Sequence, residues 1–226
     1  MANYTTADIK ALREKTGAGM LDVKKALDEA NGDAEKAIEI IRVKGLKGIA
    51  KREGRAASAG LIAAKVVDSG NSQVGVLVEI NAETDFVAKN QKFLDYAEQV
   101  LTAALDSGAT DADALAEVKV DGSTVKELTD GMQAVIGEKI VVRRVGRLEA
   151  DKIELYLHRT NPDLPAQVGV LVGTDAKAAE VAHDVAMHIA AYSPAYATRE
   201  DIPTEVVDKE RAIAEETTRA EGKPEK

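Results

Sequence analysis

The chain has 226 residues, with 30 lysines and arginines against 39 aspartates and glutamates, so its formal net charge at pH 7 is -9. It contains no cysteine and no tryptophan, and aromatic residues make up 3% of it. These figures exclude disulfide bonds, thiolate metal sites and a cysteine nucleophile, and they disfavour nucleic-acid binding through stacked bases or clustered cations.

No apolar stretch approaches the roughly 20 residues that are needed to cross a bilayer. The first five residues lack the charged-then-apolar order of a secretory signal, and acidic residues appear early, at Asp8 and Glu14. The absence of cysteine fits a reducing compartment. The sequence therefore predicts a cytoplasmic protein that does not bind membranes.

Three short helices are expected near the amino terminus. Thr5 or Thr6 can cap the first helix, a Gly-Ala-Gly turn follows at 17–19, and Asp33 can cap a third helix that ends at Gly45. Apolar residues recur at helical spacing in all three. The pattern predicts a small three-helix bundle, UBA-like in arrangement, that serves as a docking module.

A change to strand patterns follows a segment rich in glycine, lysine and arginine at 47–55, which is a linker or a short helix. Residues 61–67 and 74–80 flank a turn and predict a β-hairpin, and the apolar positions from Phe93 to Leu105 predict a long helix. A helical piece is expected around Leu115.

The second half begins with an amphipathic helix at 124–136. Residues 140–148 and 153–158 are expected to form a second hairpin, and 168–172 a further strand. Helices are expected at 178–191 and, with mostly charged residues, from 203 onward.

The two halves share a short repeat. The pentapeptide Val-Gly-Val-Leu-Val occurs at 74–78 and again at 168–172, each time before a predicted helix. Strands that come as hairpins favour antiparallel sheets over a doubly wound sheet. The predicted fold class is α+β, with two related α+β subdomains. The expected parts are a bundle at 1–45, a linker at 46–58, core subdomains at 59–150 and 151–202, and a charged helical extension at 203–226.

One segment stands out, where an apolar strand ends at 79–80 and passes Asp85 and Phe86 to a turn. Phe86 is either a core residue at the start of the next helix or an exposed wedge that enters another protein. Asp85 can be an N-cap, part of such a wedge, or both. The residues alone leave both pairs of alternatives open.

Residues 79–89 and 12–20 closely resemble the bacterial translation elongation factor Ts family, and the resemblance extends over nearly the whole chain. It implies a non-enzymatic guanine nucleotide exchange factor that promotes GDP release from elongation factor Tu by disturbing its magnesium and phosphate site. The tip that would enter the partner's G domain and dislocate its magnesium consists of Thr84, Asp85, Phe86 and Val87.

The resemblance also implies contacts from other elements. Arg13, Met20, Leu21 and Lys24 would grip the partner through the bundle, and His158 would contact another domain of it. The alternative is that Met20 and Leu21 pack inside the bundle, which we favour for Leu21. The implied partner is elongation factor Tu in its GDP-bound and nucleotide-free forms.

The family continues through a helical hairpin and a final segment, so the resemblance implies that this chain stops at Lys226 inside the first arm of that hairpin.

No pattern indicates catalysis or a cofactor. Glu79, Glu83 and Asp85 lack a histidine within metal-ligand spacing, and His183 and His188 are five residues apart, which is not the spacing that converges on one ion. Neither a nucleophile elbow nor a phosphate loop is present. We expect no catalytic residue, no metal and no direct nucleotide or nucleic-acid binding; the rival hypotheses are an RNA-binding module that uses residues 47–55, and an enzyme.

Overall fold

Three helices open the chain in the computed structural model, which describes residues 3–222. They are α1 (Thr6–Thr16), α2 (Met20–Glu29) and α3 (Ala34–Arg52). Thr5 caps α1 in a capping box with Asp8, and the side chain of Asp33 accepts hydrogen bonds from the first turn of α3. The helices share a small apolar core made of Leu12, Ala18, Val23, Ala26, Leu27, Ala30 and Ala37.

The third helix is longer than the sequence predicts, because it continues through Gly45 to Arg52. A glycine near an expected helix end favours a C-cap, but here it permits close packing. A Cβ on Gly45 would lie less than 3.0 Å from the Cβ of Ala134. The prediction of a helix end at Gly45 is therefore wrong, and of the two alternatives for the segment at 47–55, a linker or a short helix, the helix holds as far as Arg52.

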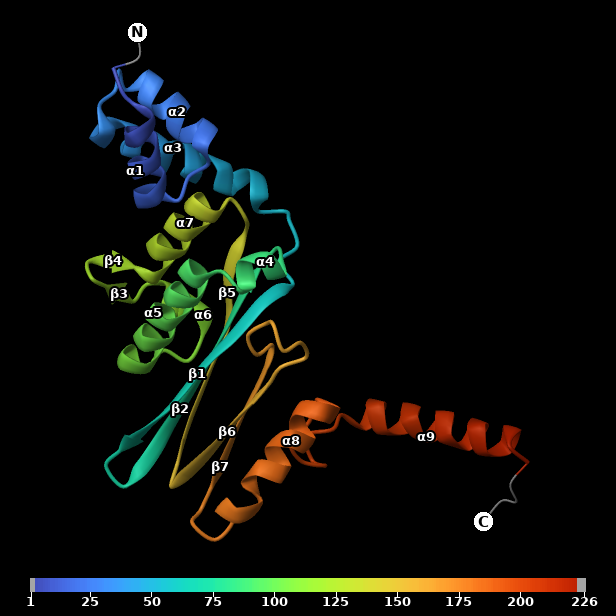
Figure 1. Ribbon diagram of the computed structural model, residues 1–226. Helices are drawn as coiled ribbons and strands as arrows, with labels where there is room; N and C mark the ends of the chain where they lie inside the picture. Colours follow the sequence, from blue (N-terminus) through green and yellow to red (C-terminus); the bar gives the residue numbers. More distant parts are fainter. Residues whose placement is uncertain (1–2, 223–226) are drawn as a thin grey trace. The chain divides into compact units, whose positions relative to one another are not determined.

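A three-stranded antiparallel sheet forms the centre of the fold, in the order β1 (Ala59–Ser69), β2 (Ser72–Ala82), β5 (Ile140–Ala150). The predicted first hairpin is confirmed, with Val67 opposite Val74 and Leu61 opposite Ile80. The helices α5 (Gln91–Ser107) and α7 (Val125–Ile136) cover one face of this sheet (Figure 1). The short elements between them are α4 (Asp85–Ala88), α6 (Ala112–Ala116), β3 (Lys119–Val120) and β4 (Ser123–Thr124).

The main core lies between these helices and the sheet. Phe93, Tyr96, Val100 and Leu101 of α5 are buried against the inward side chains of β2, as amphipathic helix spacing requires. Helices and small antiparallel sheets together confirm the α+β class.

The other face of the sheet is covered by a two-stranded antiparallel sheet of β6 (Lys152–His158) and β7 (Val168–Thr174) (Figure 1). The predicted hairpin between residues 140–148 and 153–158 is wrong, because β5 pairs with β2 and β6 pairs with β7. Only Asp151 lies between β5 and β6. A single residue is too short for a hairpin loop, so the chain crosses from one sheet to the other.

The repeated pentapeptides meet where the two sheets pack. A Cβ on Gly75 would lie 2.9 Å from a methyl carbon of Leu171, and a Cβ on Gly169 would lie 3.0 Å from a methyl carbon of Leu77. Each glycine therefore leaves room for the leucine of the other repeat. The physical reason for the repeat is reciprocal packing, in which the glycine of each strand lies against the leucine of the other.

The chain divides into two compact units at Ala190 and Ala191. A 3₁₀ turn (Ala179–Val181) and α8 (Ala182–Tyr192) follow β7, and the predicted charged helix is α9 (Thr204–Ala220), which buries none of its residues. Residues 223–226 of the predicted extension lie outside the described residues. The domain boundaries at 45, 58, 150 and 202 stay predictions. Within residues 3–222, no helix is long and apolar enough to cross a membrane.

Candidate functional site

The tip predicted from the sequence lies where β2 ends and the one-turn helix α4 begins. Val87 and Ala88 are buried in the core, with exposed fractions of 7% and 0%, whereas the ring of Phe86 is 73% exposed. A short helix anchored on one side thus presents an aromatic ring on the other. The alternative of a core phenylalanine is wrong, because the core position at this turn is occupied by Val87.

The turn before α4 is held by the segment that follows α7. Thr84 donates two hydrogen bonds to the carboxylate of Glu138, from its backbone nitrogen at 3.0 Å and from its hydroxyl at 2.8 Å. In return, the backbone nitrogen of Lys139 donates to Glu83 at 2.6 Å. Hydrogen bonds between Glu83–Thr84 and Glu138–Lys139 therefore fix the base of the tip.

Asp85 is not the N-cap of α4. Thr84 is the capping residue, and Asp85 lies exposed in the first turn, where a negative charge is favoured at a helix N-terminus. The Thr84 hydroxyl donates to Glu138 and makes no capping bond to α4. The carboxylate of Asp85 is therefore at the surface next to the exposed ring of Phe86.

A cation completes the tip. The Nζ atom of Lys89 lies 5.1 Å from the centre of the Phe86 ring, within the range of a cation–π interaction. This contact favours one orientation of an otherwise exposed ring. The tip is thus an aromatic side chain between an acidic and a basic residue.

The bundle residues implied by the resemblance lie at the surface of α1 and α2. Met20 is 53% exposed and Leu21 is 72% exposed, and Arg13 and Lys24 are exposed as well. The prediction that Leu21 packs inside the bundle is wrong. Leu21 comes two residues before the fully buried Val23, which puts it about 200° around the helix, on the opposite face.

His158 belongs to a separate group of side chains. It ends β6, and its Nδ1 atom lies 3.2 Å from the hydroxyl of Tyr156, whose ring meets His183 edge-on at 5.6 Å. His183 in turn contacts Glu154 at 2.7 Å. The structure therefore brings the four tip residues together on one turn, keeps the bundle residues on α1 and α2, and leaves His158 on the second sheet.

Comparison with known proteins decides the family. The sequence pattern described as Elongation factor TS matches residues 83–226. Over its full length the chain is 66% identical to the Elongation factor Ts of Beutenbergia cavernae and 61% identical to that of Paenarthrobacter aurescens, and it covers 81% of each. The chain belongs to the elongation factor Ts family. It is accordingly a translation elongation factor that acts in protein biosynthesis, and the resemblance stated above is confirmed.

In this elongation factor Ts chain, the carboxylates near the tip are paired separately. Glu79 meets the guanidinium groups of Arg143 at 3.6 Å and Arg144 at 2.6 Å, while Glu83 pairs with Arg55 at 3.3 Å. Within residues 3–222 no group of three or more histidine, cysteine or acidic side chains could hold a metal ion. Glu79 thus pairs with strand β5 and Glu83 with the segment before β1, so both carboxylates are engaged within the chain.

The basic segment at 47–55 is also partly occupied. The buried guanidinium of Arg52 donates to the backbone oxygen of Gln133 at 3.1 Å, and Arg55 pairs with Glu83. Two of its cations are thus committed to contacts within the chain. This observation weighs against the rival hypothesis of an RNA-binding surface at this segment.

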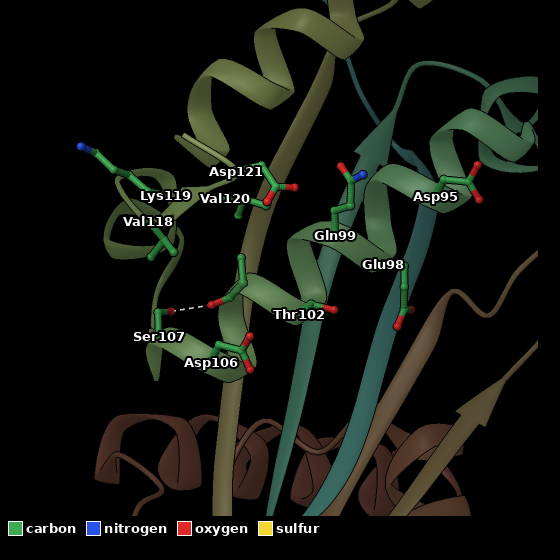
Figure 2. A pocket seen from close by; sticks show the side chains of 11 residues that line it. Asp95, Glu98, Gln99, Thr102, Asp106, Ser107, Val118, Lys119, Val120 and Asp121 are labelled. Atoms are coloured by element: carbon green, nitrogen blue, oxygen red, sulfur yellow. Dashed lines mark hydrogen bonds between the residues drawn. The ribbon is translucent and has the colours of Figure 1, made fainter. Parts of the chain in front are cut away.

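A cavity of about 820 Å³ lies elsewhere, between α5 and the β3 strand (Figure 2). Four carboxylates line it, from Asp95, Glu98, Asp106 and Asp121. Its one serine, Ser107, donates its hydroxyl to a backbone oxygen of the preceding turn, that of Ala103, at 2.7 Å. The lining contains no histidine and therefore no Ser-His pair for nucleophilic catalysis.

Sequence reasoning missed the residues that support the tip. Glu138 and Lys139 lie more than 50 residues along the chain from the turn that they hold. No local sequence pattern predicts a contact over that separation. Lys89 was within reach of sequence analysis, since side chains three residues apart on a helix are neighbours.

Proposed function

We propose that this translation elongation factor is a guanine nucleotide exchange factor that promotes GDP release from elongation factor Tu. The observation that carries the proposal is the ring of Phe86, 73% exposed on a turn whose next two residues are buried. A large apolar side chain on a fixed support is the kind of anchor that enters an apolar slot of a partner. Family membership supports the identity of that partner.

The wedge acts on the support of the partner's magnesium ion. Mg²⁺ requires near-ideal octahedral geometry and bridges the nucleotide phosphates in GTP-binding proteins. Insertion of the tip residues Thr84, Asp85, Phe86 and Val87 displaces the partner elements that hold the ion and the phosphates, so GDP binds less tightly. The chain itself contributes no catalytic residue and no cofactor to this exchange.

The bundle adds affinity. The exposed side chains of Arg13, Met20, Leu21 and Lys24 offer apolar contact flanked by cations, and methionine adapts readily to an irregular surface. His158, exposed at the end of β6, provides a further contact at a different place on the partner.

Thermodynamic linkage makes the effect on nucleotide binding reciprocal. The factor by which this chain lowers the affinity of its partner for GDP is also the factor by which GDP lowers the affinity of the partner for this chain. Binding of GTP to the shared complex then releases the chain. Both proteins act in the cytoplasm, where the partner alternates between its GDP-bound and nucleotide-free forms.

Release of fluorescent GDP from loaded elongation factor Tu tests the proposal. Addition of this chain is expected to accelerate release, and Phe86→Ala is expected to reduce the acceleration at least tenfold, since an interface anchor contributes roughly 2 kcal/mol or more. Val43→Ala serves as the matched control, because Val43 is also an exposed apolar residue, 49% exposed, but lies outside the tip. Unchanged release with correctly folded Phe86→Ala would overturn the proposal.

A further inference from the structure

The carboxyl-terminal end of α7 contacts the bundle at three places. The α3 helix approaches so closely at Gly45 that a Cβ there would lie less than 3.0 Å from the Cβ of Ala134. Arg52 of the same helix donates to the oxygen of Gln133 at 3.1 Å. After α1, a Cβ on Gly17 would lie 2.5 Å from a methyl carbon of Val135.

The same stretch of chain then holds the tip. α7 is followed by its C-cap Gly137, whose φ of +84° lies in the left-handed region that favours glycine. The next two residues are Glu138 and Lys139, which bond to Thr84 and Glu83. Seven consecutive residues, 133–139, therefore contact the bundle at one end and the base of the tip at the other.

We infer that residues 133–139 are a positioning bridge that holds the bundle and the tip at a fixed separation, and that Gly45 is the positioning residue on which this separation depends. The inference rests on the proposed function, in which bundle and tip bind one partner together. Once the bundle has docked, a fixed separation makes insertion of the tip an intramolecular step with a high effective concentration.

Packing explains why a glycine is needed. Carbon atoms at optimal contact are about 3.5–4.0 Å apart, so a methyl group on Gly45 must push α3 away from α7. Removing the methyl group of Ala134 in the same chain takes away the closest contact and leaves the Cα atom of Ala134 at 3.1 Å from the new methyl group. The double variant Gly45→Ala/Ala134→Gly should therefore recover part of the close approach that Gly45→Ala loses.

A distance measurement tests the bridge directly. The chain has no cysteine, so Lys25→Cys and Glu98→Cys, both at exposed positions, place one spin label on the bundle and one on α5. We expect a single narrow distance distribution, shifted or broadened by Gly45→Ala and moved back toward the wild-type distribution in the double variant. Gly131→Ala, on α7, is the matched control, because a Cβ there would meet nothing within 4 Å. An unchanged distribution in Gly45→Ala would overturn the inference.

Exchange kinetics test the consequence. Arg13→Ala is expected to raise the concentration for half-maximal GDP release about tenfold in the wild-type background. In the Gly45→Ala background it should raise it less than twofold, since the bundle no longer docks together with the tip. In the Gly45→Ala/Ala134→Gly background, Arg13→Ala should again raise the half-maximal concentration. A general loss of stability would not produce this recovery.

The outcomes separate the two ideas. If the wild-type chain does not accelerate release at all, the proposed function fails and the inference fails with it. If the chain accelerates release but Arg13→Ala raises the half-maximal concentration equally in the wild-type and Gly45→Ala backgrounds, only the inference is overturned. A return of this increase in the double variant supports both.

Discussion

At the scale of single residues, the tip depends on one carboxylate that comes from another part of the chain. Glu138 accepts both hydrogen bonds of Thr84. Phe86 could be singled out from the sequence as one of only two phenylalanines, but its exposure could not. The reason is that Val87, its neighbour, could fill the core in its place, and only the surrounding packing decides between them.

Glu138→Ala is expected to lower the maximal rate of GDP release several-fold with little change in the concentration for half-maximal release. The variant leaves Thr84 without its acceptor, so the tip is less well oriented, while the bundle still docks. The free energy of unfolding should fall by roughly 1.5–3 kcal/mol, the range for hydrogen bonds to a charged group. Stopped-flow release and urea unfolding measure the two effects.

Glu98→Ala controls for the loss of a negative charge by itself, since Glu98 lies exposed on α5. Glu138→Gln keeps a single carbonyl acceptor and should recover part of the rate. A normal maximal rate in Glu138→Ala would show that the two bonds to Thr84 do not orient the tip.

Tyr96 makes the stability of the core depend on pH in the alkaline range. Burial raises the pKa of its phenol well above the ordinary value of 10.0, and its hydroxyl lies 2.6 Å from that of Thr129. Below pH 10 the phenol is protonated in the folded and unfolded states alike. Above pH 10 the unfolded state releases a proton that the folded state retains, so the free energy of unfolding falls as pH rises.

Tyr96→Phe should therefore flatten the loss of stability between about pH 10 and 11.5, where free tyrosine ionises. At pH 7 the variant loses the hydrogen bond to Thr129, about 1 kcal/mol. Denaturant unfolding across this pH range gives the slope, with the more exposed Tyr196→Phe as control. Parallel slopes for wild type and Tyr96→Phe would contradict the assignment.

At the scale of elements, local signals predicted where helices begin but not how far they run or which strands pair. Thr5, Asp33 and Gly137 act as caps because the relevant hydrogen bonds and φ angles are set within a few residues. Gly45 carries the same local signal as a C-cap, yet it lies inside α3, because Ala134 of another helix needs the space. The pairing of β5 with β2 likewise depends on a contact far along the chain.

The packing of the repeated pentapeptides gives an element-scale prediction. Gly75→Val would place a branched side chain against Leu171, and it is expected to lower the free energy of unfolding by about 1–3 kcal/mol through overpacking. Gly75→Val/Leu171→Ala should recover part of that loss because the second change removes the opposing methyl groups. Urea unfolding monitored by circular dichroism measures both.

Gly146→Ala is the control for a strand glycine, because a Cβ there would meet only the Cβ of Leu77, at an ordinary 3.8 Å. It should change stability by no more than about 0.5 kcal/mol. Equal losses for Gly75→Val alone and with Leu171→Ala would show that the reciprocal packing does not limit residue size at this position.

At the scale of the whole molecule, the buried residues are confined to the first unit. Within residues 3–222, no buried residue lies beyond Ala186. All residues of α9 are exposed. A charged helix with so little apolar contact adds hardly any hydrophobic stabilisation. Stability therefore resides in the main core and the small core of the bundle.

A chain that ends after Ser193 is expected to unfold at nearly the same temperature as the full chain, with a change in free energy below about 0.5 kcal/mol. Its helical signal should fall by the contribution of α9, Thr204–Ala220. Calorimetry and far-ultraviolet circular dichroism measure the two quantities. Leu27→Ala, which empties part of the bundle core, is the positive control and should lose roughly 2–5 kcal/mol. A comparable loss on truncation would contradict the prediction.

The α+β class, the first helix caps, the first hairpin and the family could be predicted from the amino-acid sequence, because these depend on neighbouring residues or on a pattern shared along the chain. Tertiary structure alone decided that β5 joins the first sheet, that α3 continues through Gly45, that Leu21 is exposed and that Glu138 holds Thr84. The physical reason is that burial and close approach are properties of residue pairs far apart in the chain, and local propensity carries no record of the partner.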